Sequence, residues 1–244
     1  MNVYPNREAM GFAAARAGIE IMQRLLAEKG SVNLMFAAAP SQNEVLFCLQ
    51  AAKDVEYSRI TALHMDEYLD LPPNAPQGFG TFLRERLFSR VPFQKVWYIA
   101  DGSNFSDGEN MAARYEQILA DNPIDLCFMG IGENGHVAFN DPGVADFADA
   151  HLVKTVKLDE ICRQQQVNDG CFPSLSQVPT HAVTATIPAL MSAKYILCTV
   201  PSRTKARAVR ATLQDEISTL CPATILRQHG NARLYLDADA AALL

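Results

Sequence analysis

The run Leu126-Cys127-Phe128-Met129 leads directly into a glycine-rich segment at residues 130–135, and this junction decides the fold. Four consecutive apolar residues are typical of a strand that is buried on both faces, as in a parallel sheet covered by helices. Apolar stretches of strand length alternate with amphipathic, helix-like stretches along the whole chain, which predicts right-handed β-α-β units. We therefore expect a single α/β domain over residues 1–244, with a mostly parallel sheet and helices on both of its faces.

The expected elements follow from this alternation. The expected strands span residues 32–38, 60–65, 95–99, 124–129, 152–156, 194–200 and 232–236. The expected helices span residues 7–28, 41–53, 78–89, 107–121, 158–166, 187–191, 203–212 and 223–228. Ligands of such sheets bind at the carboxyl ends of the strands, so the residues just past each strand are the candidates for function.

Composition narrows the classes of partner. The net charge is −6, which gives no overall basic surface for nucleic acid. No apolar run approaches the roughly 18–20 residues of a membrane span, and the first seven residues lack the apolar core of a signal peptide. The six cysteines form no CxxC pair, so we expect reduced thiols in a cytoplasmic protein. The expected partners exclude nucleic acid and membranes, and we expect no metal and no cofactor.

Residues 130–135 spell G-x-G-x-x-G, the pattern of a dinucleotide-binding turn, and Asp149 lies near the spacing of its acidic residue. That motif needs a helix to begin in the loop, and the Asn140-Asp141-Pro142-Gly143 segment would break it. We favour a flexible loop in which Gly132 and Gly135 let peptide N–H groups approach an oxygen of a ligand.

The same loop carries His136, five residues before Asp141. Histidine titrates near neutrality and can relay a proton to and from the ring oxygen of a sugar. Asp141 would orient the imidazole and stabilise its charged form, and Asn134 would hold a hydroxyl. A lone loop histidine often has a structural role instead, and the residues alone leave that alternative open.

Asp66 and Glu67 follow the expected strand at residues 60–65. A carboxylate at that end of a strand is suited to act as a base that removes a proton alpha to a carbonyl, a step that needs no cofactor. The alternative is a helix N-cap beside a solvated acid. We take Asp66 as a candidate catalytic residue and Glu67 as a candidate for substrate binding.

Arg203 and Lys205 follow the expected strand at residues 194–200, where they would open a helix. Basic side chains beside the free N–H groups of a helix start suit a phosphate, and Ser41 could donate to the same group. The alternatives are a solvated helix start for the two cations and an ordinary N-cap for Ser41.

Three segments together resemble the glucosamine-6-phosphate deaminase family. They are His-Met-Asp-Glu-Tyr at residues 64–68, the loop at residues 130–142, and Gln-Val-Pro-Thr-His-Ala-Val-Thr at residues 177–184, in that family's order and spacing. The resemblance implies a Rossmann-like domain that acts on a small sugar phosphate, converting glucosamine 6-phosphate and water to fructose 6-phosphate and ammonia. It implies that Asp66 moves a proton between C2 and C1. It further implies that His136 opens the pyranose ring with support from Asp141, that Asn134 stands where members carry Asp or Asn, and that Lys205 binds the phosphate.

The chain departs from the family at the phosphate end. Ala38-Ala39-Pro40-Ser41 replaces a Gly-Ser-Thr or Gly-Gly-Thr loop, residues 167–170 lack the arginine expected there, and Asp141 replaces a glutamate. These changes keep two further hypotheses open. One is a lactonase or other sugar-phosphate hydrolase of the related 6-phosphogluconolactonase type. The other is a sugar-phosphate-binding protein without catalysis. A homo-oligomer is neither required nor excluded by the sequence.

Overall fold

The computed structural model describes residues 1–101 and 106–244, which form a seven-stranded sheet with a three-stranded sheet beside it. The large sheet has the order β1 (Asn2–Tyr4), β10 (Ala232–Asp237), β9 (Tyr195–Val200), β6 (Leu126–Met129), β2 (Val32–Phe36), β3 (Ile60–His64) and β5 (Lys95–Val96). Its neighbouring strands all pair in parallel. The small sheet is antiparallel and has the order β4 (Asp66–Tyr68), β8 (His181–Ala185) and β7 (Val153–Lys157).

The α-helices connect these strands. They are α1 (Arg7–Lys29), α2 (Asn43–Ala51), α3 (Phe79–Leu83), α4 (Gly108–Asp121), α5 (Glu160–Asn168), α6 (Ile187–Met191) and α7 (Ala206–Gln214). Shorter helical turns are η1 (Pro40–Gln42), η2 (Tyr57–Arg59), η3 (Arg84–Phe88), η4 (Leu175–Gln177), η5 (Arg203–Lys205) and η6 (Pro222–Gln228). Helix α1 begins because the Asn6 side chain accepts the N–H of Ala9, and it ends at Gly30, whose φ of 83° suits glycine.

Helices cover both faces of the large sheet, as the sequence predicts. Successive residues of a strand point to opposite faces, and β6 shows the two environments. Phe128 packs in a core with residues of α1 and α2, whereas Cys127 and Met129 pack in a second core with residues of α4, α6 and α7. The four-residue apolar run of β6 therefore has a partner layer on each side. The expectation of a mostly parallel sheet with two helical layers is confirmed.

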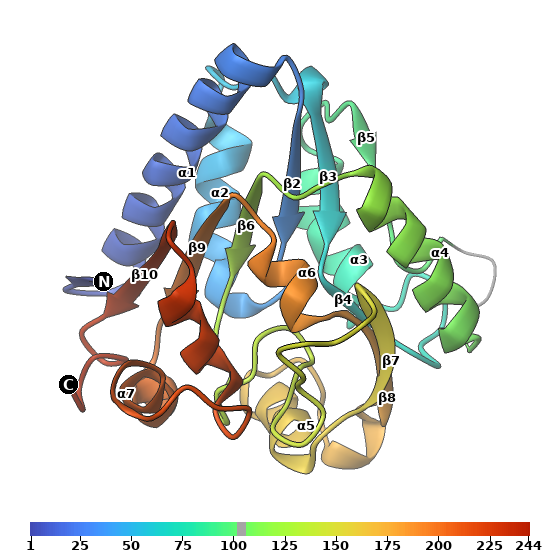
Figure 1. Ribbon diagram of the computed structural model, residues 1–244, viewed down its shortest axis with the longest axis vertical. Helices are drawn as coiled ribbons and strands as arrows, with labels where there is room; N and C mark the ends of the chain where they lie inside the picture. Colours follow the sequence, from blue (N-terminus) through green and yellow to red (C-terminus); the bar gives the residue numbers. More distant parts are fainter. Residues whose placement is uncertain (102–105) are drawn as a thin grey trace.

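The strand order reverses beside β2, and this reversal positions the site. From β2 the chain proceeds outward to β3 and β5, then returns to β6 on the other side of β2 and continues to β9 and β10. The connections that leave β2 and β6 therefore diverge, which leaves a crevice at their carboxyl ends. Figure 1 shows β2 and β3 running toward the end of the molecule that carries α5 and the strands β7 and β8.

The sequence patterns do not predict three of the strands, β1, β4 and β8. Strand β4 is the informative case, because Asp66 and Glu67 were expected to lie just past a strand and instead form one. Both are buried, against the ordinary preference of acidic residues, because β4 pairs with β8 in a second sheet that local patterns do not reveal. Strand β5 is also shorter than expected, and the expected helix at residues 78–89 divides into α3 and the π-type turn η3.

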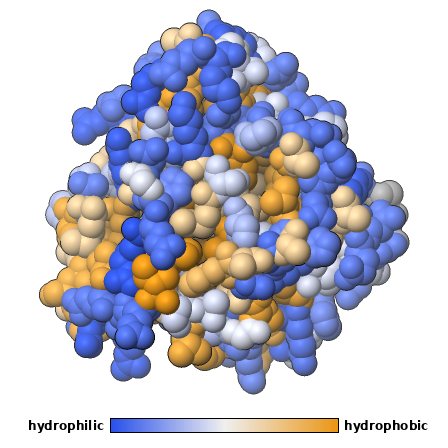
Figure 2. All heavy atoms as spheres, in the orientation of Figure 1, coloured by the Kyte–Doolittle hydropathy of each residue, from blue (hydrophilic) through white to orange (hydrophobic). Residues whose placement is uncertain are grey.

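None of the helices in the described ranges is long and apolar enough to cross a membrane. On the face shown in Figure 2, apolar side chains lie among hydrophilic ones. The six cysteines are free thiols, three of them buried.

Gly18 permits the close contact between α1 and the sheet. A Cβ at this position would lie 2.6 Å from Cζ of Phe128, and that ring cannot retreat because it is buried and stacks on Phe36 with centroids 5.3 Å apart. We expect Gly18→Val to lower the free energy of unfolding by about 1–3 kcal/mol through overpacking. Urea unfolding measures this, with Ala27→Val on the exposed side of α1 as the control. Equal stability of the two variants would contradict the packing argument.

Candidate active site

A cavity lies at the carboxyl ends of β2, β3, β6 and β9, where the strand order reverses. Its walls come from the segments that follow these strands, from the start of α1 and from α5. Its lining residues include Arg7, Ser41, Asp66, Gly132, His136, Gln165, Asp169 and Lys205. The structure therefore brings together Asp66, His136, Gly132, Ser41 and Lys205 from the sequence-based candidates.

Asp66 occupies one side of the cavity. It is 6% exposed, and no donor among the described residues is hydrogen-bonded to its carboxylate. Burial raises the pKa of this carboxyl well above its usual range, and the nearby charge of Glu67 adds to the effect. The group therefore holds a proton more tightly than an exposed aspartate, which makes its ionised form a stronger base.

His64 fixes the backbone of Asp66 through a hydrogen bond. The N–H of Ile99 donates to Nε2 of His64 at 3.0 Å, so Nδ1 carries the proton and donates to the carbonyl of Asp66 at 2.9 Å. Burial lowers the pKa of His64 to about 4, which keeps the ring neutral at physiological pH. Both ring nitrogens are thus engaged, and His64 is a positioning residue that sequence reasoning missed. Its place in the His-Met-Asp segment was the available signal.

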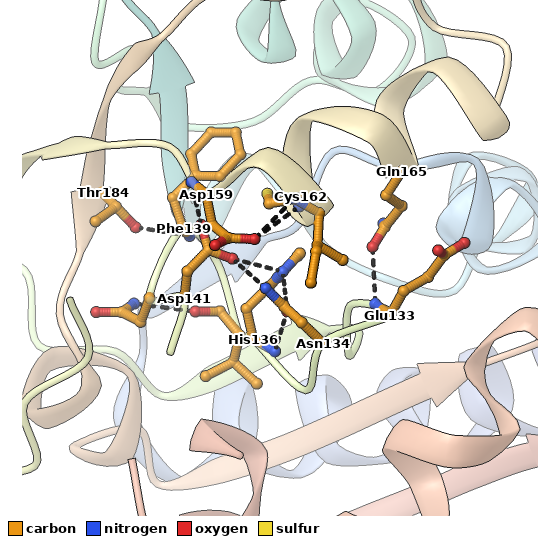
Figure 3. A network of polar contacts seen from close by, with 12 residues as sticks. Glu133, Asn134, His136, Phe139, Asp141, Asp159, Cys162, Gln165 and Thr184 are labelled. Carbon is orange, nitrogen blue, oxygen red and sulfur yellow. Dashed lines mark hydrogen bonds and ion pairs between the residues drawn. The ribbon is translucent and has the colours of Figure 1, made fainter. Parts of the chain in front are cut away.

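The loop at residues 130–141 orients His136 (Figure 3). Nδ1 of His136 lies 2.7 Å from Oδ1 of Asn134 and 2.9 Å from Oδ1 of Asp141. Both partners are acceptors, so Nδ1 carries the proton and Nε2 is left for a ligand. Asn134 also donates its amide to Asp141 at 3.0 Å. Burial disfavours the charge on Asp141, yet hydrogen bonds from His136 and Asn134 outweigh it and lower the pKa of Asp141. Asn134 and Asp141 therefore hold His136 from behind the cavity wall.

The glycines of the loop fix its shape, and their own N–H groups are engaged within the loop. The N–H of Gly132 donates to the carbonyl of His136 at 2.9 Å, and that of Gly135 donates to the carbonyl of Gly132 at 3.1 Å. A Cβ on Gly132 would lie 2.1 Å from the His136 ring. Gly135 has a φ of 84°, and a Cβ there would lie 2.5 Å from Sγ of Cys221. Gly135 does not line the cavity.

The small sheet joins the base to this loop. Asp66 pairs with Thr184 across β4 and β8, and the hydroxyl of Thr184 accepts the N–H of Phe139 at 3.1 Å. One residue further along each segment, the side-chain amide of Asn140 donates to the carbonyl of Ala185 at 2.9 Å. Asp66 and the His136 loop are therefore attached to the same strand.

Glu67 does not line the cavity, which corrects its assignment to substrate binding. Its carboxylate accepts backbone N–H groups from Tyr68, Phe79 and Gly80 at 2.8–3.0 Å. Burial raises the pKa of Glu67, and these three donors oppose the rise. The side chain faces away from the cavity because β4 alternates its faces, and it anchors the first turn of α3.

Lys205 and Ser41 lie at the other end of the cavity. The Lys205 side chain is buried and its Nζ has no hydrogen-bond partner among the described residues, although Oε1 of Glu133 is 4.0 Å away. Burial lowers the pKa of this ammonium, while Asp169 and then Glu133 oppose the effect. A buried ammonium without a partner suits an anion from solution. Ser41 accepts a hydrogen bond from Gln42 at 3.2 Å.

Arg203 points elsewhere and Arg7 takes a place that the sequence did not predict. Arg203 is exposed on η5 and lies outside the cavity, because in this tight turn its side chain diverges from that of Lys205. Arg7 at the start of α1 lines the cavity and is held by Glu44 at 2.8 Å and by the carbonyl of Pro40 at 2.8 Å. No local pattern marked Arg7, because its place at the cavity depends on the packing of α1 against α2 and the large sheet.

A group with metal-ligand atoms lies behind the wall. One atom each from His136, Asp141 and Cys162 fall within 4.8 Å of one another. The His136 and Asp141 atoms are hydrogen-bonded to each other. Burial raises the pKa of the Cys162 thiol well above its usual range, so that the thiol stays protonated. Hydrogen bonding accounts for the grouping of these three residues.

The chain is similar to known proteins in sequence and in fold. The model of the glucosamine-6-phosphate isomerases/6-phosphogluconolactonase family matches residues 5–235. The glucosamine-6-phosphate deaminase of Bacillus cytotoxicus is 38% identical over 94% of this chain and 84% of its own length, and that of Bacillus cereus strain B4264 is 37% identical over the same shares. A monomeric glucosamine-6-phosphate deaminase of known structure matches with a TM-score of 0.88 and 28% identity over all of both chains. A 6-phosphogluconolactonase from Trypanosoma brucei shares the fold, with a TM-score of 0.82 and 18% identity over 100% of this chain and 97% of its own.

Burial of an unpaired carboxylate at Asp66 predicts a cost in stability. Because the pKa of Asp66 is raised in the folded protein, the cost appears as pH rises above the ordinary pKa of aspartate and is complete above the raised value. We expect Asp66→Asn to raise the melting temperature at pH 8 by a few degrees, on the order of 1 kcal/mol or more, and to leave it unchanged near pH 3. Calorimetry at both pH values measures this. A variant less stable than the wild type at pH 8 would refute the argument.

Proposed function

Because the chain belongs to the family of glucosamine-6-phosphate isomerases and 6-phosphogluconolactonases, we propose that it is a glucosamine-6-phosphate deaminase, which converts glucosamine 6-phosphate and water to fructose 6-phosphate and ammonia. The observation that carries the proposal is the shared cavity of Asp66, His136 and Lys205. It places a buried carboxylate, an oriented imidazole and an unpartnered ammonium around one space. This combination suits proton transfer on a sugar that carries an anionic group at one end.

His136 would open the ring. With the proton fixed on Nδ1 by Asn134 and Asp141, Nε2 is free to take the proton of the C1 hydroxyl and return it to the ring oxygen. The imidazolium that forms between these two steps is stabilised by the ionised Asp141, whose pKa is lowered. The product of this step is the open-chain aldehyde, in which the hydrogen on C2 is alpha to a carbonyl.

Asp66 would move the proton. Its ionised carboxylate removes the C2 hydrogen of the aldehyde, giving an enolamine, and returns a proton to C1. The resulting imine at C2 reacts with water to give the ketose and ammonia. The reaction therefore consumes no external oxidant or reductant. The raised pKa of Asp66 matches this role, because it increases basicity toward a carbon acid. Turnover should therefore fall as pH drops and Asp66 becomes protonated.

Lys205 would hold the phosphate, with Ser41 and Arg7 nearby. A phosphate oxygen would supply the hydrogen bond that the buried Nζ of Lys205 lacks within the part of the chain that the structure describes. Proline at position 40 removes one backbone donor from this region, which leaves the binding of phosphate more dependent on side chains.

A cytoplasmic setting is part of the proposal. All six cysteines are free, and burial keeps Cys127 and Cys198 protonated by raising their pKa. Free thiols are typical of proteins from reducing compartments. The small-molecule sugar phosphate is the proposed partner.

The wild-type protein should release ammonia and a ketose phosphate from glucosamine 6-phosphate, and should exchange the C2 hydrogen with solvent deuterium. Asp66→Asn removes the base, so we expect turnover and exchange to fall about 10²–10⁴-fold. A coupled ammonia assay and proton NMR measure the two rates. Asp146→Asn on the surface is the control, and near-wild-type exchange in Asp66→Asn would remove the base assignment.

Lys205→Ala should raise KM about 10–100-fold and change kcat little, because a phosphate contact acts equally on the ground and transition states. Steady-state kinetics with glucosamine 6-phosphate measure both constants. Arg203→Ala is the matched control, since Arg203 is a neighbouring cation outside the cavity, and its KM should stay at the wild-type value. If Arg203→Ala and Lys205→Ala raise KM equally, the placement of the phosphate is wrong.

A further inference from the structure

Around Lys205, the cavity has less net positive charge than the binding of a doubly charged anion would favour. Lys205 supplies the one buried cation among the described lining residues. Glu133 approaches it from the glycine-rich loop, with Oε1 at 4.0 Å from Nζ, and that oxygen is also buried and has no hydrogen-bond partner within residues 1–101 and 106–244. Asp169, just past the end of α5, lines the same cavity. Two carboxylates therefore accompany one ammonium.

Gln165 fixes both acidic residues in place. Its Oε1 accepts the backbone N–H of Glu133 at 2.8 Å, and its Nε2 donates to Oδ2 of Asp169 at 3.3 Å (the first contact is drawn in Figure 3). One side chain of α5 thus ties the loop to the carboxylate of Asp169. Among the charges that favour the protonated form of Lys205, that of Asp169 has the largest effect. Asp169 therefore lies within electrostatic reach of the ammonium, and it raises the pKa of Lys205 against the effect of burial.

Arg7 does not restore the balance. Its guanidinium makes two hydrogen bonds to the Glu44 carboxylate, at 2.8 and 3.0 Å, and a third to the carbonyl of Pro40. A paired guanidinium still offers N–H donors, but its charge is largely offset by its partner. The remaining ionisable lining residues, Asp66 and His136, belong to the other end. A ligand group near Lys205 is therefore attracted by one cation and repelled by Asp169 and Glu133.

We propose that Asp169 is a specificity-determining residue, which makes this end of the cavity favour an ester group with a single negative charge over a dianionic phosphate. The proposal rests on the proposed function, because it concerns the group that an amino sugar carries opposite the reacting carbons. A singly protonated phosphate and a sulfate ester share this chemistry. The first could also donate its P–OH hydrogen to a carboxylate, which a dianion cannot do.

Binding of two unreactive open-chain ligands tests the proposal at one pH. The 6-phosphate and 6-sulfate of 2-amino-2-deoxyglucitol lack a carbonyl, and at pH 8 the phosphate is a dianion because its second pKa is about 6, whereas the sulfate remains a monoanion. Calorimetry should show that the wild type binds the sulfate at least as tightly as the phosphate. Asp169→Asn should shift the ratio of the two Kd values about three- to tenfold toward the phosphate, the effect of one charge at this range.

Two variants serve as matched controls. Asp169→Glu keeps the charge and should keep the ratio, and Glu160→Gln removes an exposed charge from α5 outside the cavity and should also keep it. A ratio that Asp169→Asn leaves within twofold of wild type overturns the proposal, as does a wild type that binds the phosphate more than tenfold more tightly.

Turnover separates this outcome from the proposed function. Ammonia from glucosamine 6-sulfate would assign the monoanion to a sulfate ester, and ammonia from the 6-phosphate alone would assign the ligand to a phosphate ester. If neither ester releases ammonia while the binding ratio still responds to Asp169→Asn, the proposed function fails and the charge selectivity stands.

Discussion

The parallel pairing of β2 with β6 is the constraint on which the rest of the structure depends. The strand order reverses at this pair, so the segments that leave the two strands turn in opposite directions and leave a space between them. The packing of Phe36 against Phe128 across the same pair holds the two strands in register on one face of the sheet. Residues far apart in the chain meet at this space because each follows the carboxyl end of a neighbouring strand.

Buried polar contacts then shape the walls of the space. Gln42 is 1% exposed and donates to Thr199 at 2.8 Å and to the carbonyl of Met129 at 3.3 Å, so one amide connects the segment that follows β2 to the carboxyl ends of β6 and β9. On the far side, Asp237 accepts the N–H of Ser202, a residue held at a φ of 88°. A non-glycine residue in that region costs about 1–3 kcal/mol, which the surrounding contacts must offset. Buried side chains thus fix the backbone that surrounds the cavity.

The sequence predicts the parallel sheet and its helical layers because long apolar runs report burial on both faces. It also predicts which loops meet, since Asp66, His136 and Lys205 all follow expected strands. It does not reveal β4, whose acidic residues are buried by pairing with a strand more than a hundred positions away. It misjudges Glu67 and Arg203 because the direction of a side chain depends on strand alternation and turn geometry. Arg7 is missed for a similar reason, since its place depends on the packing of α1 against α2 and the large sheet.

The attachment of Asp66 and of the His136 loop to β8 has a mechanical consequence. Asp66 pairs with Thr184, and the same threonine holds Phe139 of the loop. A rigid displacement of the small sheet against the large one would therefore carry the base and the imidazole together and preserve the distance between them. What would change is their distance from Lys205 and Ser41, which lie on the turns that follow β9 and β2 of the large sheet. Such a displacement would thus alter the length of the ligand that the cavity accepts, and would leave the alignment of the reacting groups unchanged.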